Sequence, residues 1–481
     1  MPPGNERESM ELLTAQQKRL SALGQEHLLS FVNELPEREK EQFLKQMAAS
    51  DIETVLRLYK ELVRGGAKAD VMPPVSELSA APYVKYPKTG DEWFLWLEAK
   101  RAGVTALKSG QVACLMVAGG QGSRLGFEGP KGAFPIGPVS NRTLFQVQSE
   151  KVLAASKRYN RAIPFFIMVS ESNEADTRGF FIEHDYFGLE PEDLYFFKQE
   201  NIPAVDENGK IVLEGKGRLF TSPNGHGGCV KALRDSGMLD EMKNRGIHTM
   251  SYFQVDNPLV RAVDPYFIGF HIMNKADMSL KCLLKRSPTE KVGNVVMHKG
   301  RLRVIEYSDL SDAAANLRDD DGGLRFRLGS IAIHIFDAGF LRRMSEEAGG
   351  LPYHVAHKKI ACVDTKGNKI EPKAPNGYKF EMFIFDTLPQ AQRAVVVETI
   401  RENEFSPVKN AEGEASPATS RADLARLYRS WLAEAGLKVP QGDVKVEISP
   451  LVATDAQELK ETLAGKKIEV RDGLELTLDK L

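Results

Sequence analysis

Three mainly apolar segments mark the middle of the chain, at residues 112–117, 165–169 and 249–255. Each has the length of a strand that is buried on both faces. Thr143 followed by Gln146 is typical of a capping box that opens a helix after the first run. Strands that alternate with helices predict an α/β fold with a doubly wound sheet, mixed but mostly parallel. Ligands bind at the carboxyl ends of such strands.

The two ends of the chain show different patterns. Near the N-terminus, apolar residues recur at helical spacing, and a proline-rich linker follows them. Towards the C-terminus, we expect a strand at residues 394–400 and a helix at 419–437. The length and these changes of pattern predict three domains. They are an N-terminal helical cap at 1–100, a central α/β domain at 101–393 and a small C-terminal α+β domain at 394–481.

The first apolar run leads into a loop with six glycines between Gly119 and Gly132. Glycine lets the main chain approach a ligand closely and turn its N–H groups towards it. Arg124 and Lys131 add two positive charges to the same loop. Exposed backbone donors and two cations suit a polyphosphate, so we expect the loop to hold a nucleoside triphosphate. A glycine-rich turn with only a structural role is the alternative.

Two common phosphate-binding loops do not fit this segment. A dinucleotide-binding turn needs a third glycine where Leu125 stands. The P-loop needs Ser or Thr directly after its lysine, but Gly132 follows Lys131. A dehydrogenase is therefore only a distant possibility.

Asp256 directly follows the third apolar run, so we expect it at the same sheet edge as the glycine loop. Mg²⁺ prefers carboxylate oxygens and bridges phosphates, which makes Asp256 the predicted Mg²⁺ ligand. The alternative is a helix N-cap in front of Pro258. His354 and His357 form an H-x-x-H pattern, but the lysines beside them disfavour a metal and favour a structural role.

The composition argues against several classes of partner. The formal net charge of −2 gives no reason to expect nucleic acid or an acidic membrane surface. The four cysteines are widely scattered, as is typical of reduced thiols in a cytoplasmic protein. We find no signal-peptide pattern and no apolar run of about 18 residues. We expect a cytoplasmic monomer or weak homo-oligomer that binds neither nucleic acid nor membranes.

Seven segments, in order along the chain, resemble the eukaryotic-type UDP-sugar pyrophosphorylases, which include the UDP-N-acetylhexosamine and UDP-glucose enzymes. In that family a Gly-Gly-x-Gly-[Thr/Ser]-Arg-Leu-Gly loop, followed by Pro-Lys-Gly, holds the phosphates of UTP. The resemblance covers residues from about 90 to 410, and its segments are 119–132, 225–228, 254–257, 304–308, 354–359, 376–379 and 401–410.

This resemblance implies a Rossmann-like nucleotidyltransferase fold and a role for each matching residue. The implied catalytic residues are Arg124, Lys131 and Lys379. The implied nucleotide-binding residues are Val117, Ala118, Gly119, Gly120, Gln199, Gly225 and Asp256. The implied sugar-phosphate-binding residues are His226, Glu306, Tyr307, Ser330 and Lys409. A glutamine amide both donates and accepts, which suits the edge of uracil.

The implied reaction joins UTP to a sugar 1-phosphate and releases pyrophosphate, with Mg²⁺ as cofactor. A sugar phosphate has its second pKa near about 6 and is mostly dianionic at neutral pH, so no general base is needed. A hypothesis from another class is a nucleotide-binding regulatory protein without catalysis.

Two positions depart from the N-acetylhexosamine enzymes, which carry Asn where this chain has His226 and Ser330. Both positions face the sugar in the family, and the glucose-type enzymes carry Gly-His at the first of them. The rest of the chain is most similar to the N-acetylhexosamine enzymes. N-acetylglucosamine 1-phosphate is therefore the predicted substrate, and glucose 1-phosphate is the alternative.

Overall fold

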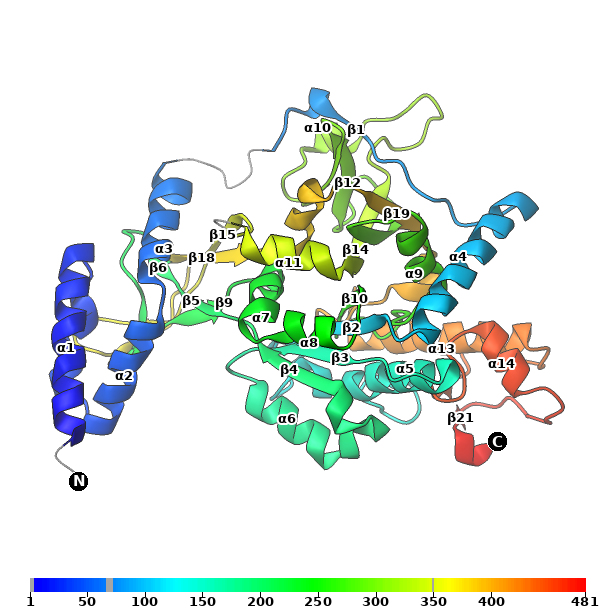
Figure 1. Ribbon diagram of the computed structural model, residues 1–481, viewed down its shortest axis with the longest axis horizontal. Coiled ribbons are helices and arrows are strands. Elements are labelled where there is room, and N and C mark those ends of the chain that lie inside the picture. Colours follow the sequence, from blue (N-terminus) through cyan, green and yellow to red (C-terminus); the bar gives the residue numbers. More distant parts are fainter. Residues whose placement is uncertain (1–3, 66–71, 348–349) are drawn as a thin grey trace. The chain divides into compact units, whose positions relative to one another are not determined.

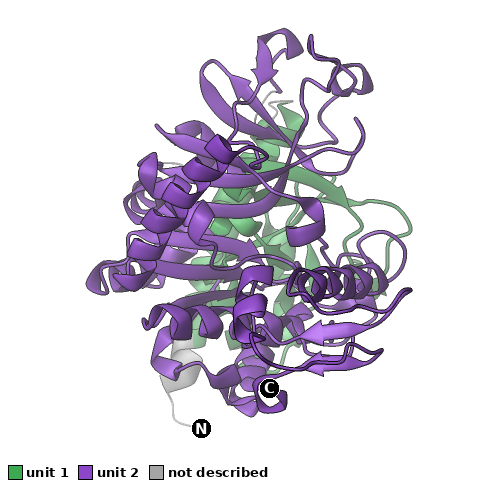
Figure 2. Cartoon of the chain, turned by 90° about the vertical axis from the view of Figure 1, so that its right-hand side faces the viewer, with its two compact units in different colours: residues 1–71, 199–228, 351–384 green, residues 72–198, 229–350, 385–481 purple. Residues whose placement is uncertain are grey.

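The structure, a computed structural model, describes residues 4–65, 72–347 and 350–481 (Figure 1). Contacts within the chain define two compact units, shown in Figure 2. Unit 1 consists of Met1–Val71, Gln199–Gly228 and Leu351–Ile384, and unit 2 of Met72–Lys198, Cys229–Gly350 and Phe385–Leu481. The predicted domain boundaries near residues 100 and 393 stay predictions. Residues 1–3 and 66–71 of the predicted cap lie outside the described residues.

Unit 2 is built on a ten-stranded sheet with the strand order β1-β12-β14-β10-β2-β3-β4 along its main path. In addition, β13 pairs with β12, β11 with β14, and β19 with β11. The strands are β1 Leu78–Ala80, β2 Val112–Val117, β3 Phe165–Val169, β4 Leu194–Lys198, β10 Thr249–Gln254, β11 Met278–Leu284, β12 Gly293–His298, β13 Arg301–Ile305, β14 Leu328–Asp337 and β19 Ala394–Glu398.

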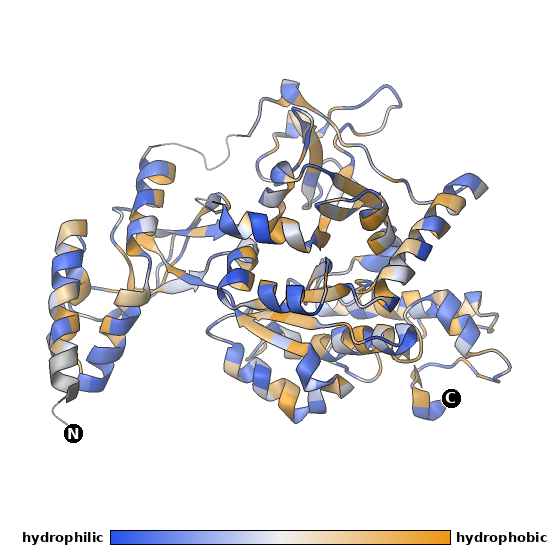
Figure 3. Cartoon of the chain, viewed as in Figure 1, coloured by the Kyte–Doolittle hydropathy of each residue, from blue (hydrophilic) through white to orange (hydrophobic). Residues whose placement is uncertain are grey.

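The four strands β10, β2, β3 and β4 are parallel neighbours, whereas β14 runs antiparallel beside β10. All six residues of β2 are buried. Because successive strand residues point to opposite faces, both faces of the sheet are covered at this strand. Figure 3 shows the apolar colouring concentrated in these central strands. The predicted α/β fold with a mixed, doubly wound sheet is confirmed, and the three apolar runs are its strands β2, β3 and β10.

Helices connect and cover these strands. They are α4 Gly90–Lys108, α5 Leu144–Tyr159, α6 Glu174–Glu183, α7 Cys229–Asp235, α8 Met238–Asn244, α9 Pro265–Met273, α10 Asp312–Ala315, α11 Ala338–Glu346, α12 Arg401–Glu404, α13 Pro417–Glu434 and α14 Ala456–Thr462. At α5 the Thr143 side chain accepts from the Gln146 N–H at 3.2 Å, as predicted. The other half of the capping box was predicted wrongly, because the Gln146 amide instead donates to Glu150 at 2.8 Å.

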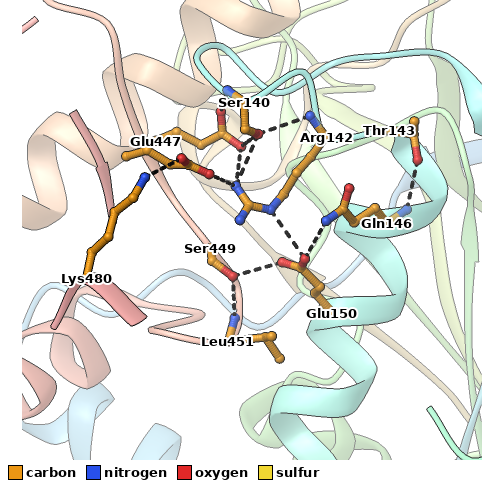
Figure 4. A network of polar contacts seen from close by, with 10 residues as sticks. Ser140, Arg142, Thr143, Gln146, Glu150, Glu447, Ser449, Leu451 and Lys480 are labelled. Atoms are coloured by element: carbon orange, nitrogen blue, oxygen red, sulfur yellow. Dashed lines mark hydrogen bonds and ion pairs between the residues drawn. The ribbon is translucent and has the colours of Figure 1, made fainter. Parts of the chain in front are cut away.

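The C-terminal segment packs on the same hydrophobic core as the sheet of unit 2. Its short parallel pair, β20 Val446–Ile448 and β21 Leu474–Leu476, is tied to α5 by one arginine (Figure 4). The Arg142 guanidinium lies 3.3 Å from Glu150, 2.9 Å from Glu447 and 2.8 Å from Glu475. Charged groups from three segments thereby fix the C-terminal segment beside the start of α5.

Unit 1 combines three segments that are far apart in the sequence. Its helices are α1 Gly4–Leu23, α2 Glu37–Ala49 and α3 Ile52–Leu58, and its strands are β5 Asn201–Pro203, β6 Val205–Asp206, β7 Leu213–Gly215, β8 Arg218–Leu219, β9 Thr221–Pro223, β15 Tyr353–Lys358, β16 Cys362–Val363, β17 Lys369–Ile370 and β18 Gly377–Met382. One core joins Leu44 of α2 and Val55 of α3 to Ile202 and Phe380 of the strands. In neither unit is any described helix long and apolar enough to cross a membrane.

The crossing of α4 and α9 gives a stability prediction, because the two helices touch through glycines. A Cβ added at Gly269 would lie 1.6 Å from the Ala99 carbonyl oxygen. Backbone atoms cannot move aside, so Gly269→Ala should cost at least about 3 kcal/mol, at the upper end of overpacking effects. Gly179→Ala in α6 is the matched control, because a Cβ there meets nothing within 4 Å. It should be neutral or stabilise by about 0.5–1 kcal/mol. Thermal unfolding of both variants checks this, and equal melting temperatures would contradict it.

Candidate active site

The glycine-rich loop after β2 is closed by its own backbone. Lys131 N–H donates to the Gly120 carbonyl at 3.0 Å, and Gly122 N–H donates to Gly129 at 2.9 Å. Gly129 has a φ of +113°, which an L side chain rarely adopts. Arg124 is exposed and makes no hydrogen bond or ion pair with a described residue. The loop therefore has a fixed shape while one of its cations remains available to a ligand.

Polar side chains after β3 support the same loop. The Asn173 amide donates to the Ala118 carbonyl at 2.9 Å and to the Gly120 carbonyl at 3.4 Å. Gln121 donates to the Ser172 carbonyl at 3.0 Å. Asn173 is fully buried, so its bonds are shielded from water. With these carbonyls engaged, the N–H groups of Gly119 and Gly120, which donate to no described residue, remain available to a ligand.

Lys131 and Asp256 meet at the carboxyl edge of the sheet. Because β2 and β10 are parallel with Val117 opposite Gln254, the residues that follow both strands lie side by side. The Lys131 ammonium donates to Asp256 Oδ2 at 2.7 Å, and the two side chains are only 17% and 15% exposed. The predicted convergence of the loop and Asp256 is therefore present. The alternative reading of Asp256 as a helix N-cap is wrong, because no helix starts there.

A third segment joins this edge through Asp256 and Asn257. Val408 N–H donates to the Asp256 carbonyl at 2.8 Å, so the backbone just before the exposed Lys409 lies against Asp256. The Asn257 side chain donates to the Glu404 carbonyl at 2.7 Å and accepts from Ser406 N–H at 3.1 Å. The Asn257 amide thus aligns the chain that carries Lys409 with the end of β10.

A buried charge cluster anchors the same segment. The Lys281 ammonium donates to Asp264 at 2.6 Å and to both oxygens of Glu404 at 2.5 and 2.7 Å. All three side chains are at most 6% exposed. Breaking one partner of such a group leaves a buried unpaired charge, which costs about 3–5 kcal/mol. The segment that leads to Lys409 is therefore rigidly held.

Glu306 and Ser330 come together around Gly293. Glu306 follows β13, Ser330 lies in β14, and Gly293 begins β12 between them. A Cβ at Gly293 would lie 3.8 Å from the Glu306 carboxylate and 3.9 Å from Cβ of Ser330. Because β14 is antiparallel to β10, its N-terminal half lies at the sheet edge that carries Asp256. Tyr307 is next in the chain and 44% exposed, so it is not a core residue.

The other predicted site residues belong to unit 1. Gln199 donates through its amide to the Gly225 carbonyl, so two predicted nucleotide-binding residues are in contact. Gly225 has a φ of +85°, and a Cβ there would lie 2.3 Å from the Met382 carbonyl oxygen. His226 Nδ1 accepts from Ile384 N–H at 3.2 Å, and its ring stacks on Phe383 at 5.4 Å. The His226 imidazole is therefore held in one orientation.

Lys379 also lies in unit 1, with its ammonium 4.6 Å from the centre of the Phe220 ring. Burial lowers the pKa of Lys379, while the nearby Glu381 carboxylate opposes this shift. The two histidines of the H-x-x-H pattern stack on aromatic rings instead of facing each other. His354 lies 4.4 Å from Phe383, and His357 lies 4.7 Å from Tyr378.

Asp256 fits a magnesium ligand that shares its ion with substrate. Its second carboxylate oxygen accepts no hydrogen bond from a described residue. Among the described residues, no group of three or more His, Cys, Asp or Glu side chains could hold a metal ion. Mg²⁺ commonly takes only one or two protein carboxylates and fills its octahedron with phosphates and water. The donor set therefore suits Mg²⁺ only together with a polyphosphate.

The sequence profile of the family described as UTP–glucose-1-phosphate uridylyltransferase matches residues 92–427. The chain belongs to this family, the UDP-sugar pyrophosphorylases. The human UDP-N-acetylhexosamine pyrophosphorylase-like protein 1 is 35% identical over 94% of this chain and 95% of its own length. The UDP-N-acetylglucosamine pyrophosphorylase of Saccharomyces cerevisiae is 36% identical over 85% of this chain and 86% of its own.

A solved pyrophosphorylase structure shares the fold. The UDP-N-acetylglucosamine pyrophosphorylase of Trypanosoma brucei superposes with a TM-score of 0.80 at 28% identity, covering 94% of each chain. The resemblance inferred from seven short segments thus extends over nearly the whole chain.

Lys151 supports the turn that follows Asp256, and the sequence did not reveal this contact. It lies on α5, and its ammonium donates to the carbonyls of Pro258 at 2.5 Å and Val260 at 2.8 Å. These carbonyls belong to the turn directly after Asp256. Burial lowers the pKa of Lys151 to about 7, although the Glu404 carboxylate opposes the shift. No local motif marks such a lysine, because its partners are more than 100 positions away.

The pKa of Lys151 gives a prediction on stability. The pKa is lower in the folded chain than the ordinary 10.5, so between pH 7 and 10 the unfolded chain binds more protons. The free energy of unfolding should therefore rise with pH in this window, by up to about 1.4 kcal/mol per pH unit from this group. Urea unfolding at pH 7, 8 and 9 measures the slope. Lys151→Met should flatten it, and an unchanged slope in that variant would exclude Lys151 as its source.

Proposed function

We propose that the protein transfers the uridylyl group of UTP to N-acetylglucosamine 1-phosphate and releases pyrophosphate. The main support for this proposal is the contact of Lys131 with Asp256 beside the glycine-rich loop. It brings backbone donors, cations and one carboxylate together at a fixed place. Membership of the pyrophosphorylase family and the names of the relatives support the reaction class and the sugar.

In this reaction an oxygen of the sugar phosphate attacks the α-phosphorus of UTP, and pyrophosphate leaves. The phosphate dianion is already a nucleophile at neutral pH, so the protein has to align two anions and stabilise charge. The unbonded N–H groups of Gly119 and Gly120 and the side chain of Arg124 are suited to the triphosphate. Lys131 would move from Asp256 to a phosphate oxygen, and Lys409 and Lys379 would neutralise further phosphate charge.

Asp256 would hold Mg²⁺ together with phosphate oxygens of UTP. When bound, the ion would supply positive charge that polarises the phosphates of the nucleotide. Once Lys131 has moved to a phosphate oxygen, the Asp256 carboxylate would be free to hold the ion. Gln199 and Gly225, which contact each other in unit 1, are proposed to recognise uracil.

The sugar would lie against the group formed by Glu306, Ser330 and Gly293. Glu306 can accept hydrogen bonds from sugar hydroxyls. The serine at 330 is shorter than an asparagine and carries a single donor, so it reaches less far towards a sugar. His226 can donate through Nε2, since Nδ1 accepts from a backbone N–H. Glucose 1-phosphate remains the second candidate because of these two residues.

We further infer that the protein works in the cytoplasm as a monomer or weak homo-oligomer. Four unpaired cysteines fit a reducing compartment. The alternative hypothesis is a nucleotide-binding regulatory protein without catalysis. Measuring turnover of UTP and a sugar 1-phosphate distinguishes this hypothesis from the proposed enzyme.

Charge removal at the ion pair is the first activity prediction. Lys131→Met should lower kcat about a hundredfold or more, because preorganised charge stabilises the transition state. Asp256→Asn should lose a similar factor and need more Mg²⁺ for half-maximal rate. The assay measures pyrophosphate release from UTP and N-acetylglucosamine 1-phosphate.

Lys467→Met, at an exposed lysine of the C-terminal segment, is the matched control and should keep the normal rate. No turnover by the unaltered protein with any sugar phosphate would favour the regulatory alternative. Full activity of Asp256→Asn would show that substrate phosphates alone hold the metal.

The second activity prediction concerns the sugar. We expect a higher kcat/KM with N-acetylglucosamine 1-phosphate than with glucose 1-phosphate. Ser330→Asn should increase this ratio, because the longer amide can both donate and accept at the sugar. A preference of more than about tenfold for glucose 1-phosphate, about 1.4 kcal/mol, would instead assign the chain to the glucose-using enzymes.

A further inference from the structure

A cavity of about 590 Å³ lies in unit 2 at the sheet edge opposite to the glycine-rich loop. Its walls include the residues at the starts of β2, β10, β11 and β19 and the end of β14. The helices α4, α9 and α11, labelled in Figure 1, contribute the remaining walls. Its volume is within the range of small-molecule sites, about 300–1,000 Å³. None of the residues assigned to uridylyl transfer lines it.

The charges around this cavity favour an anion. The cationic side chains are Lys275, Arg343 and Arg393, and His248 lies beside them. Lys275 and the terminal nitrogens of Arg393 have no hydrogen-bond partner among the described residues. The Arg393 side chain is fixed on the Lys275 backbone, because its Nε donates to the Lys275 carbonyl at 2.6 Å. Both residues line the cavity, and neither charge is paired with a described carboxylate.

The carboxylates of the cavity wall are already engaged. Asp277 accepts from Arg343 at 3.1 Å and from the N–H groups of Gln392 and Arg393 at 2.7 and 3.0 Å. Burial opposes ionisation of Asp277, but these donors lower its pKa below the ordinary value. Asp337 caps α11 by accepting from Phe340 N–H at 2.9 Å. The two carboxylates thus position the wall and engage Arg343, while Lys275 and the terminal nitrogens of Arg393 remain available.

His271 adds a polar side chain to the wall of the cavity. It lines the cavity from the end of α9 and is only 3% exposed. Its Nδ1 lies 2.9 Å from the hydroxyl of Ser279, which fixes the ring. Nε2 has no hydrogen-bond partner among the described residues. Nε2 is therefore available to a ligand atom in the cavity.

We propose that this cavity binds a small phosphorylated metabolite, of the size of a sugar phosphate. Lys275 and Arg393 would hold the phosphate, since a guanidinium fork and an ammonium match its several oxygens. His271 would bond to a hydroxyl or a phosphate oxygen deeper in the cavity. A phosphate dianion is favoured over a single carboxylate because two unpaired cations face it.

The test uses calorimetric titration of the full-length protein with glucose 6-phosphate, ribose 5-phosphate and inorganic phosphate. Lys131→Met/Lys409→Met removes two lysines of the proposed active site, and Lys275→Asn/Arg393→Gln removes the two cavity cations. Asn tolerates the left-handed backbone of Lys275, where φ is +45°. We expect at least one probe to bind the active-site variant as tightly as the unaltered protein. The cavity variant should bind it at least tenfold more weakly.

Lys438→Asn/Arg471→Gln, at exposed positions of the C-terminal segment, is the matched control and should bind normally. Equal binding by the cavity variant and this control would overturn the proposal. The absence of saturable binding in the active-site variant would also overturn the proposal, because the probe would then bind at the active site and not in the cavity. Citrate binding as tightly as the best phosphate would overturn the assignment of phosphate. These outcomes are independent of turnover, so they are distinct from a failure of the proposed function.

Discussion

The ion pair of Lys131 with Asp256 is the contact around which the candidate site is arranged. Both side chains are largely buried, so each charge would be costly without the other. A pair of this kind adds little net stability, because the desolvation cost nearly cancels the attraction. Its value is that two opposite charges are kept at the sheet edge before any substrate arrives. A phosphate of UTP can then take the place of Asp256 as the partner of Lys131. The metal ion can take the place of Lys131 as the partner of Asp256.

The surrounding structure makes that contact possible by aligning three chain segments. Parallel pairing of β2 with β10 brings the glycine-rich loop beside Asp256. Asn257 and the Lys281 cluster then fix the segment that carries Lys409. None of these supports touches the proposed substrates directly. They limit the motion of groups that do, which is what preorganised electrostatic stabilisation requires.

The sequence was informative where structure is local. Mainly apolar segments identified β2, β3 and β10, and the rule that ligands bind at strand ends predicted Asp256 beside the loop. Only one half of the predicted capping box is present. The Gln146 side chain donates to Glu150, which also accepts from Arg142, so it does not reach back to Thr143. No local sequence pattern identified Asn173 and Lys151, because their contacts are with backbone groups of other elements. Unit 1 was also beyond reach, since its three segments are separated by more than 100 residues.

The glycines of the loop are needed for two different reasons, which the sequence alone does not distinguish. Gly132 is required by packing, because a Cβ there would lie 2.1 Å from the Phe145 ring. Gly120 differs: a Cβ there meets nothing within 4 Å and its φ is not in the left-handed region. Neither packing nor backbone strain of the substrate-free protein explains a glycine at this exposed position. A ligand that approaches the main chain closely does explain it, because even a methyl group would hold phosphate oxygens away from the N–H groups.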